Sequence, residues 1–224
     1  MSIPQLCSIQ VGLPKTIGVE AATNPMEGSW STGFFKEPIQ GLIWLGKTNL
    51  VGDGQADLKN HGGVDKAVLG YAAEHYPTWR KSLNQIQDKI NFPYGAFGEN
   101  FTIGGQRETS VCIGDIYQVG EAKIQVSQPR KPCWKLSRRW GIDDLALEVQ
   151  KTGRTGWYFR VLKEGYVQSG LPLILSDRPF PEWTVAQAND IMYNRCTDPD
   201  VKRKLATCPL LSANWQEKLL NSIK

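Results

Sequence analysis

Residues 121–136 read EAKIQVSQPRKPCWKL, a stretch in which a strand pattern stops abruptly. Ile124 and Val126 alternate with polar neighbours, which is the two-residue period of a β-strand with one buried face. Pro129 and Pro132 follow. Each proline lacks a backbone N–H and fixes φ, so a central strand cannot continue through them. The stretch therefore predicts a strand that ends in a stiff loop.

Cys133 comes directly after the second proline and has three cations as close neighbours in the sequence, Arg130, Lys131 and Lys135. Nearby positive charge favours a thiolate over a thiol. The thiolate is the form that attacks electrophiles and binds soft metals. The sequence therefore nominates Cys133 as the centre of function.

Short strand-like pieces separated by glycine-rich turns recur on both sides of this stretch, as expected for antiparallel β structure. From Asp65 to Trp79, apolar residues recur at three- and four-residue steps, so we expect part of this segment to form an amphipathic helix. Residues 137–153 carry a second helical pattern. After Pro179 and Pro181 the sequence reads as three short helices, with Thr184 and Ser212 as candidate N-caps. Such helices bury little surface alone, so we expect a small bundle or packing against the β domain.

Composition narrows the functional class. The 224 residues are 41% hydrophobic and 21% charged, which is ordinary for a globular protein. The net charge of +4 suits a small anionic ligand, and the chain has no dense basic tract that would predict nucleic-acid binding. It also has no apolar run of about 18 residues that would predict a membrane span, and its N-terminus lacks the features of a secretory signal.

The numbers and spacing of cysteine and histidine indicate a protein of a reducing compartment, and they predict no structural metal site in the chain. The five cysteines are widely spaced and form no C-x-x-C pair, so neither a disulfide framework nor a structural zinc site is expected. A cytoplasmic protein is the natural interpretation. With only two histidines, one chain cannot build a multi-histidine metal site.

Glycine-rich loops carry the remaining candidate site residues. Lys36 ends the segment WSTGFFK and Arg154 begins RTGW, and such loops can bind an anion through a cation and backbone N–H groups. His61 and Asn100 adjoin glycines that let a ligand approach the backbone closely. Other interpretations of these residues stay open. Lys36 and Arg154 could be solvated cations of exposed loops, and the His61 side chain could hydrogen-bond only within its own turn. His75 lies on the apolar face of the predicted helix, and we expect it to be a core histidine with a hydrogen-bond partner.

The sequence lacks the motifs of several well-known classes of site. No G-x-S-x-G nominates a serine hydrolase, no spacing nominates the paired carboxylates of a glycosidase, and no nucleotide-binding glycine motif stands between a strand and a helix. Two interpretations of Cys133 remain. It could be a nucleophile paired with His61, or a thiolate ligand of a soft, redox-active metal carried by an anionic cofactor. The residues alone do not choose between them.

Five blocks of the sequence carry a resemblance to a known family: STGFFKEPI, GDGQADLKNHGGVDKAVLGYAAEHYPTW, GAFGENF, IGDIYQVGEAKIQVSQPRKPCWKL and TGRTGWYFRVL. They resemble the MOSC family, which is named for the C-terminal domain of molybdenum cofactor sulfurases. The resemblance covers nearly the whole chain, and the tail is similar to a small three-helix domain that follows MOSC in some members.

This resemblance implies a mainly β fold: a closed β-barrel with a few helices at residues 1–176, followed by a three-helix domain at 177–224. It also implies binding of molybdenum cofactor, a pterin with a phosphate and a dithiolene-held metal. Cys133 matches the cysteine that supplies a further thiolate to molybdenum in related enzymes, so it would be both catalytic residue and metal ligand. Lys36, Arg130 and Arg154 would bind the phosphate, and His61 and Asn100 are candidates for pterin or substrate contacts.

The implied activity is reduction of N-hydroxylated compounds, including hydroxylaminopurines and amidoximes, by two-electron removal of an oxygen atom, a form of base detoxification. The chain carries no flavin or iron–sulfur motif. Electrons would therefore come from a separate flavin or iron–sulfur protein. The alternative within the family is a non-catalytic carrier of the cofactor, or of sulfur as a persulfide on Cys133.

Overall fold

A computed structural model describes residues 3–23, 27–83, 91–193 and 198–223. Its centre is an eight-stranded sheet in the order β12-β8-β9-β10-β6-β7-β1-β4, in which β6 and β7 are parallel and the other neighbours antiparallel. The strands of this sheet are β12 (Ile174–Asp177), β8 (Ile116–Val119), β9 (Ala122–Pro129), β10 (Trp157–Lys163), β6 (Val68–Ala72), β7 (Phe101–Gly104), β1 (Gln5–Val11) and β4 (Glu37–Pro38). Two small sheets pair β5 (Ile43–Leu45) with β11 (Gly165–Val167), and β2 (Lys15–Ile17) with β3 (Trp30–Thr32).

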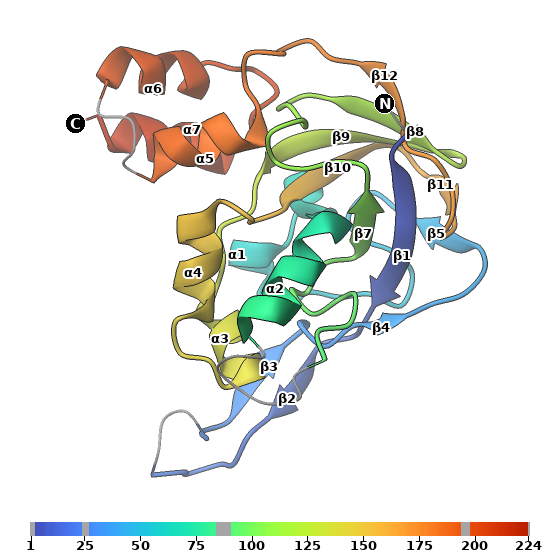
Figure 1. The fold of residues 1–224 in the computed structure, drawn as a ribbon, viewed down its shortest axis with the longest axis vertical. Coiled ribbons are helices and arrows are strands. Elements are labelled where there is room, and N and C mark those ends of the chain that lie inside the picture. The colour runs from blue at the N-terminus through green and yellow to red at the C-terminus, as the bar shows by residue number, and fades with distance from the viewer. Residues whose placement is uncertain (1–2, 24–26, 84–90, 194–197, 224) are drawn as a thin grey trace.

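The eight-stranded sheet curls but stays open, so the expected closed barrel is wrong (Figure 1). Within the described residues, its two outer strands, β12 and β4, do not pair with each other, and β4 is only two residues long. Loop residues, rather than a strand, bond to the chain at the start of β1: Leu6 N–H donates to Leu171 O at 2.9 Å, and Leu173 N–H donates to the carbonyl of Pro4, just before the strand, at 2.8 Å. The architecture is a curled half-barrel with helices.

The strand predicted around Ile124 is confirmed as β9, which lies in the sheet between β8 and β10 and ends at Pro129. Five residues later the chain enters α3 (Trp134–Trp140), followed by α4 (Leu145–Thr152). The single helical segment expected over 137–153 is therefore two helices. Gly141 ends α3 with a φ of 64°, a left-handed conformation that glycine adopts without strain.

The expected helix between Asp65 and Trp79 is only partly present. Residues 68–72 instead form β6, in which every residue is buried, and this strand pairs with β10 on one side and β7 on the other. A strand buried on both faces reads as a continuous apolar run, which sequence periodicity does not separate from a helix. The helix α2 begins only at Tyr76 and continues to Leu83. Shorter helices flank β6: α1 (Leu58–His61), η1 (Val64–Lys66) and η2 (Ala73–His75).

The predicted C-terminal helices are confirmed as α5 (Val185–Met192), α6 (Pro199–Ala206) and α7 (Ala213–Asn221). Thr184 caps α5 in a reciprocal capping box with Gln187, and Ser212 caps α7. Buried side chains of these helices, such as Leu205 and Trp215, belong to the same core cluster as strand residues Phe159 and Val126. The helices therefore pack against the sheet (Figure 1). The boundary at residue 176 stays a prediction.

Gly156 links this fold to the end of β9, because its carbonyl accepts the backbone N–H of Arg130 at 3.0 Å. Its φ is +75°, and a Cβ there would lie 2.4 Å from the carbonyl oxygen of Gly70. Gly153 has a similar φ of +71°, but a Cβ there would meet nothing within 4 Å. Alanine substitutions at the two positions can therefore separate the free-energy cost of a left-handed backbone from the cost of a steric clash.

We predict that Gly156→Ala destabilises the protein by about 3 kcal/mol, the sum of a left-handed alanine and an overpacked contact. Gly153→Ala should cost only about 1 kcal/mol. Urea unfolding followed by circular dichroism measures both. Equal losses of unfolding free energy in the two variants would show that the close approach to β6 does not constrain residue 156.

Candidate functional site

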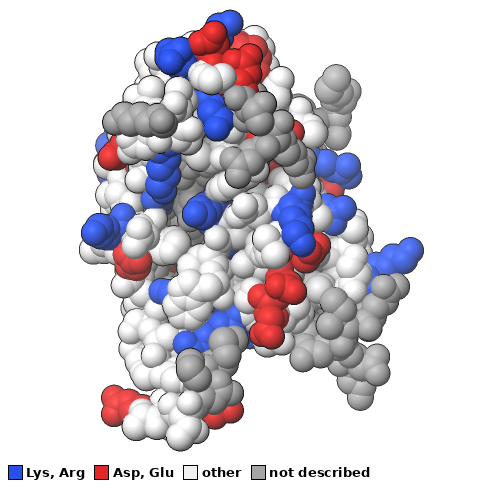
Figure 2. All heavy atoms as spheres, turned by 90° about the vertical axis from the view of Figure 1, so that its left-hand side faces the viewer, with Lys and Arg blue, Asp and Glu red and all other residues white. Residues whose placement is uncertain are grey.

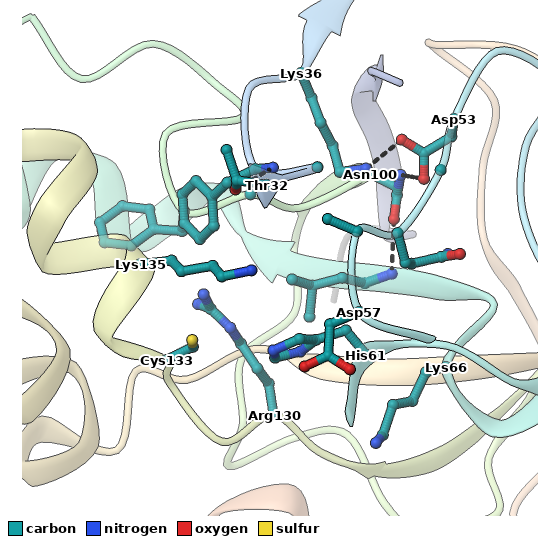
Figure 3. Close-up of a pocket in the computed structure, with 18 of the residues that line it drawn as sticks. Thr32, Lys36, Asp53, Asp57, His61, Lys66, Asn100, Arg130, Cys133 and Lys135 are labelled. Carbon is teal, nitrogen blue, oxygen red and sulfur yellow. Dashed lines mark hydrogen bonds and ion pairs between the residues drawn. The ribbon is translucent and has the colours of Figure 1, made fainter. Parts of the chain in front are cut away.

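A cavity that is partly open to solvent lies beside Cys133. Residues 32–36, 53–61, 97–100 and 130–135 contribute most of its lining, together with Lys66, Leu69 and Tyr158. In Figure 3, Cys133, Arg130, Lys135 and His61 are directed toward the same space, while Lys36, Asp53 and Asn100 form another wall. The fold thus brings together five of the residues nominated from sequence: Lys36, His61, Asn100, Arg130 and Cys133.

Cys133 is the residue that precedes α3, and it is half-buried at the wall of the cavity. Its φ of −114° and ψ of 150° continue the extended chain that leaves β9, and its carbonyl accepts the Leu136 N–H at 3.0 Å. The thiol is free, as are those of Cys7, Cys112 and Cys208, which agrees with the expected lack of a disulfide framework among the described residues. Cys196 lies outside the described residues.

Arg130 contributes a buried positive charge to the same wall. The residue is 3% exposed, and its guanidinium lies 5.9 Å from the centre of the Phe34 ring. The Nη1 atom is buried and has no hydrogen-bond partner in the described part of the chain. A buried, unpartnered guanidinium nitrogen is costly in free energy. It is therefore the clearest sign in this cavity of a missing anionic or acceptor ligand.

Further cations and one histidine surround Arg130. Lys135 Nζ donates to Ser31 O at 2.8 Å, and Lys66 Nζ donates to Asn60 O at 2.6 Å, so both ammonium groups are oriented by backbone carbonyls. Burial lowers the pKa of His61, and the neighbouring Lys135, Lys66 and Arg130 lower it further, against the opposing charge of Asp57. This direction of the pKa shift favours the neutral imidazole of His61, a form that offers one donor and one acceptor to a ligand.

A buried network forms the wall opposite Cys133. Lys36 makes an ion pair with Asp53 Oδ1, which also accepts the Gly12 N–H at 3.0 Å. Asn100 donates to Asp53 Oδ2 at 2.9 Å and accepts the Leu69 N–H at 3.1 Å. Burial lowers the pKa of Lys36, and the Asp53 carboxylate partly offsets that effect. Lys36 and Asn100 line the cavity, but their side chains already bind Asp53 and the Leu69 backbone. Much of their hydrogen-bonding capacity therefore holds the wall together.

Arg154 is not brought to the cavity with the other nominated residues. Its guanidinium lies 5.3 Å from the ring of Trp79 on α2, and it is absent from the cavity lining. Asp53, Asp57, Lys66 and Tyr158 line the cavity without having been nominated. The first three stand in the block GDGQADLKNHGGVDK, where a turn rich in aspartate and lysine was the available signal.

His75 is a buried core residue, as expected, with its Nε2 atom 2.7 Å from Glu108 Oε2. Within the described ranges, no group of three or more His, Cys, Asp or Glu side chains could hold a metal ion. A metal at Cys133 would thus need most of its ligands from a bound molecule. None of the helices described is both long and apolar enough to cross a membrane.

A family model described as the MOSC domain matches residues 57–173, which include the end of β9 and Cys133. The chain belongs to the MOSC domain family. A second model, described as the YiiM-like, 3-alpha helix domain, matches residues 183–221, which contain α5, α6 and α7. The combination confirms the resemblance seen in the sequence, including that of the tail.

Two bacterial proteins are similar to this MOSC protein over most of their length. The YflK protein of Bacillus subtilis (strain 168) is 40% identical over 213 residues, covering 95% of this chain and 91% of YflK. Protein YiiM of Escherichia coli (strain K12) is 39% identical over 180 residues, covering 80% of this chain and 79% of YiiM. A Gibberella moniliformis protein named "Reductase" is 35% identical over 169 residues, covering 75% of this chain but 30% of that protein.

Solved structures show the same fold. The crystal structure of YiiM from Geobacillus stearothermophilus superposes on this chain with a TM-score of 0.80 at 35% identity, covering 99% of this chain and 100% of that YiiM. That of Escherichia coli YiiM gives a TM-score of 0.75 at 35% identity, covering 86% of this chain and 89% of YiiM.

The charged residues around His61 in the cavity predict the direction in which its pKa shifts when a neighbour is replaced. NMR titration of the wild type should give a pKa for His61 below the usual histidine value, because burial disfavours the cation. Lys135→Met removes a neighbouring positive charge and should raise that pKa, whereas Asp57→Asn removes a negative charge and should lower it. The chain has only two histidines, so the His75 signal is an internal control. Shifts in the same direction in both variants would contradict the described cavity.

Proposed function

We propose that this MOSC protein is a reductase of N-hydroxylated compounds that binds molybdenum cofactor in the cavity, with Cys133 as a thiolate ligand of the metal. One observation carries the proposal: Cys133 lines the same cavity as Arg130, whose Nη1 atom is buried and has no hydrogen-bond partner among the described residues. A soft metal ligand and an anion-binding group in the same space match a cofactor that contains both a thiophilic metal and a phosphate. The family and the relative named "Reductase" support an oxidoreductase.

The residues present fit the anionic part of this cofactor. Arg130 would donate to the phosphate through its unpartnered nitrogen, and Lys66, Lys131 and Lys135 add positive charge to the lining. Charge-assisted hydrogen bonds from guanidinium groups are among the strongest for phosphate. Neutral His61, with one donor and one acceptor, would suit the amide-like edge of a pterin. Lys36 and Asn100 would contact the cofactor only through hydrogen-bonding capacity that Asp53 and Leu69 leave free.

The residues also fit a metal that arrives with other ligands. Cys133 supplies one thiolate, and the described chain offers no three-residue cluster that could replace a bound molecule's ligands. When bound, the cofactor would supply two-electron oxygen-atom transfer chemistry. The chain's own residues would hold the anion, orient the metal at Cys133 and enclose the substrate. Breaking the N–O bond of a hydroxylamine consumes two electrons and two protons and releases the amine and water.

A separate flavin or iron–sulfur protein would deliver the electrons, because the sequence contains no motif for either cofactor. We propose no nucleic-acid or membrane partner. Lys and Arg side chains on the face in Figure 2 are interspersed with Asp and Glu, unlike the continuous basic stripe typical of nucleic-acid binding. The four free cysteines described are compatible with a reducing cytoplasm.

The metal-ligand role of Cys133 is tested by replacing its sulfur. Protein produced in a cofactor-competent host should hold about one molybdenum per chain and reduce benzamidoxime when given a chemical electron donor. Cys133→Ser should lower the molybdenum content or change its spectroscopic signature, and should abolish reduction, because the thiolate is lost. Cys7→Ser, at an exposed thiol of β1 outside the cavity, should leave both unchanged. Full reduction by Cys133→Ser would refute the ligand role.

The same measurements distinguish the carrier alternative. A non-catalytic carrier would hold the cofactor, or a persulfide on Cys133 detectable by mass spectrometry, without turnover under any electron donor. A cysteine hydrolase with Cys133 and His61 would instead be trapped covalently by electrophilic substrate analogues in metal-free protein.

The anion-binding role of Arg130 is tested against Arg154, the nominated arginine that lies outside the cavity. Arg130→Met should reduce affinity for the phosphate-bearing pterin by about 10- to 100-fold, since a hydrogen bond to a charged group is worth about 1.5–3 kcal/mol. Arg154→Met should retain wild-type affinity, because that side chain stacks on Trp79. Pterin content after gel filtration, measured by fluorescence, reports both. Equal losses would show that net charge, rather than the buried guanidinium, holds the cofactor.

A further inference from the structure

Two buried residues outside the cavity, Glu108 and His75, contact the point that holds Arg130 in place. Glu108 Oε1 accepts the backbone N–H of Gly156 at 2.8 Å, and Glu108 Oε2 lies 2.7 Å from His75 Nε2. Both residues are buried, and neither of them lines the cavity. A buried carboxylate is costly in free energy unless its oxygens are paired. Here one of the two oxygens is paired with the backbone of Gly156.

The bond to Glu108 changes the way in which β9 and β10 separate. In an antiparallel ladder, two residues that form a hydrogen-bonded pair exchange both backbone bonds. Arg130 N–H donates to Gly156 O at 3.0 Å, but Gly156 N–H donates to Glu108 rather than back to Arg130. Pro129, the last residue of β9, has no N–H to contribute. The strand end that leads to Arg130 therefore depends on Gly156, and Gly156 depends on Glu108.

Glu108 is itself fixed from two sides. Its backbone carbonyl accepts the Ala186 N–H at 2.8 Å, so the first turn of α5 holds the main chain at residue 108. His75, the last residue of η2, holds the carboxylate oxygen that does not bind Gly156. Hydrogen bonds to an ionised acceptor are stronger than those between neutral groups. Gly156 is therefore held at its N–H by a strong acceptor whose backbone and side chain are both anchored.

We propose that Glu108 is a positioning residue for Arg130: by fixing Gly156, it holds the end of β9 and the Arg130 guanidinium in the place where an anion binds. His75 orients Glu108 for this role. The identity of the anion as a cofactor phosphate rests on the proposed function, whereas the positioning role rests on the hydrogen bonds around Gly156. Neither Glu108 nor His75 would touch the ligand, because both lie outside the cavity lining.

A purely electrostatic role for Glu108 predicts the opposite effect on anion binding. Burial and the Glu108 charge raise the pKa of Tyr71, and Arg130 lowers it, so both charges lie within electrostatic reach of this buried ring. A carboxylate near the site repels an anion, and on charge alone its removal strengthens anion binding. If Glu108 positions Arg130, its removal weakens binding instead. The sign of the change in affinity therefore distinguishes the two roles.

The test measures how tightly the full chain, produced in a cofactor-competent host, retains the phosphate-bearing pterin, by pterin fluorescence after gel filtration. Glu108→Met removes the charge and both acceptors. It should weaken binding by about tenfold, the lower end of the range for losing a group that orients a ligand-binding side chain. Glu108→Gln removes the charge but keeps an acceptor for Gly156 N–H, and should retain at least wild-type affinity. In an Arg130→Met background, Glu108→Met should cause no further loss, because the two residues act as one unit.

Asp115 is a matched control for the loss of a buried carboxylate. It accepts the Cys112 N–H at 2.9 Å and pairs with Arg178 at 2.6 Å, and neither partner lines the cavity. Asp115→Leu should lower the midpoint of urea unfolding, as Glu108→Met does, and should leave pterin affinity unchanged.

Amide hydrogen exchange in the cofactor-free protein gives a second measurement that does not depend on the cofactor. In Glu108→Met, the Arg130 amide should exchange at least about tenfold faster relative to the amides in the middle of β10, because local opening of the strand end becomes easier. Asp115→Leu should leave this ratio unchanged. His75→Phe keeps a ring but removes the orienting nitrogen, and should change the ratio less, in the same direction. If Glu108→Met does not fold, His75→Phe decides the outcome alone.

Three results would overturn the proposal: unchanged or stronger pterin binding by folded Glu108→Met, equal losses of affinity in Glu108→Met and Asp115→Leu, or additive losses in the double variant with Arg130→Met. The outcome for the proposed function is separate. If the wild type holds no pterin but the Arg130 amide responds to Glu108→Met, the proposed function fails and the positioning role stands. If Arg130→Met loses pterin while Glu108→Met changes neither affinity nor exchange, the positioning role fails and the cofactor site stands.

Discussion

The hydrogen bond from Arg130 N–H to Gly156 O, at 3.0 Å, is the constraint on which the candidate site depends. It is the last backbone bond that ties the end of β9 to the start of β10, just before the chain turns away through Pro132 to α3. Because the residues from Pro129 to Cys133 are stiffened by two prolines, fixing this point also positions the guanidinium of Arg130 and the thiol of Cys133 on one wall. Gly156 is required there because its left-handed φ and its close approach to Gly70 leave no room for a side chain.

The neighbouring structure braces the same strand end. From one side, Ser212 at the start of α7 donates its N–H to Ser127 O at 2.9 Å and its hydroxyl to Gln128 Oε1 at 2.7 Å. The C-terminal helices therefore hydrogen-bond directly to β9, next to the residues that enter the cavity. From the other side, Leu136 of α3 packs in an aromatic cluster with Phe92 and Phe97. This arrangement gives the tail a structural role in holding the site, although none of its described residues belongs to the cavity lining.

The opposite wall is held by charge rather than by backbone pairing. Asp53 binds Lys36, Asn100 and the Gly12 N–H, and so joins three loops that are distant in the sequence. Isolated buried charges are costly, so each member of this network depends on the others, and removing one partner leaves another unpaired. The result is a cavity with a rigid, internally satisfied wall facing a wall where Arg130 Nη1 is unsatisfied. That asymmetry, more than net charge, indicates where an anion would bind.

The sequence by itself determined the strand that ends at Pro129, the stiff loop that carries Cys133, the capped helices after Thr184, and, through resemblance, the MOSC family. These features are local: proline chemistry, capping side chains and short blocks of residues carry them. Only the tertiary structure decided that residues 68–72 form a buried strand, that the sheet stays open, that Lys36 and Asn100 bind Asp53, and that Arg154 stacks on Trp79 outside the cavity. Each of these features depends on a residue or strand far away along the chain. The periodicity of a segment and the composition of a loop do not indicate which distant residue a side chain will contact.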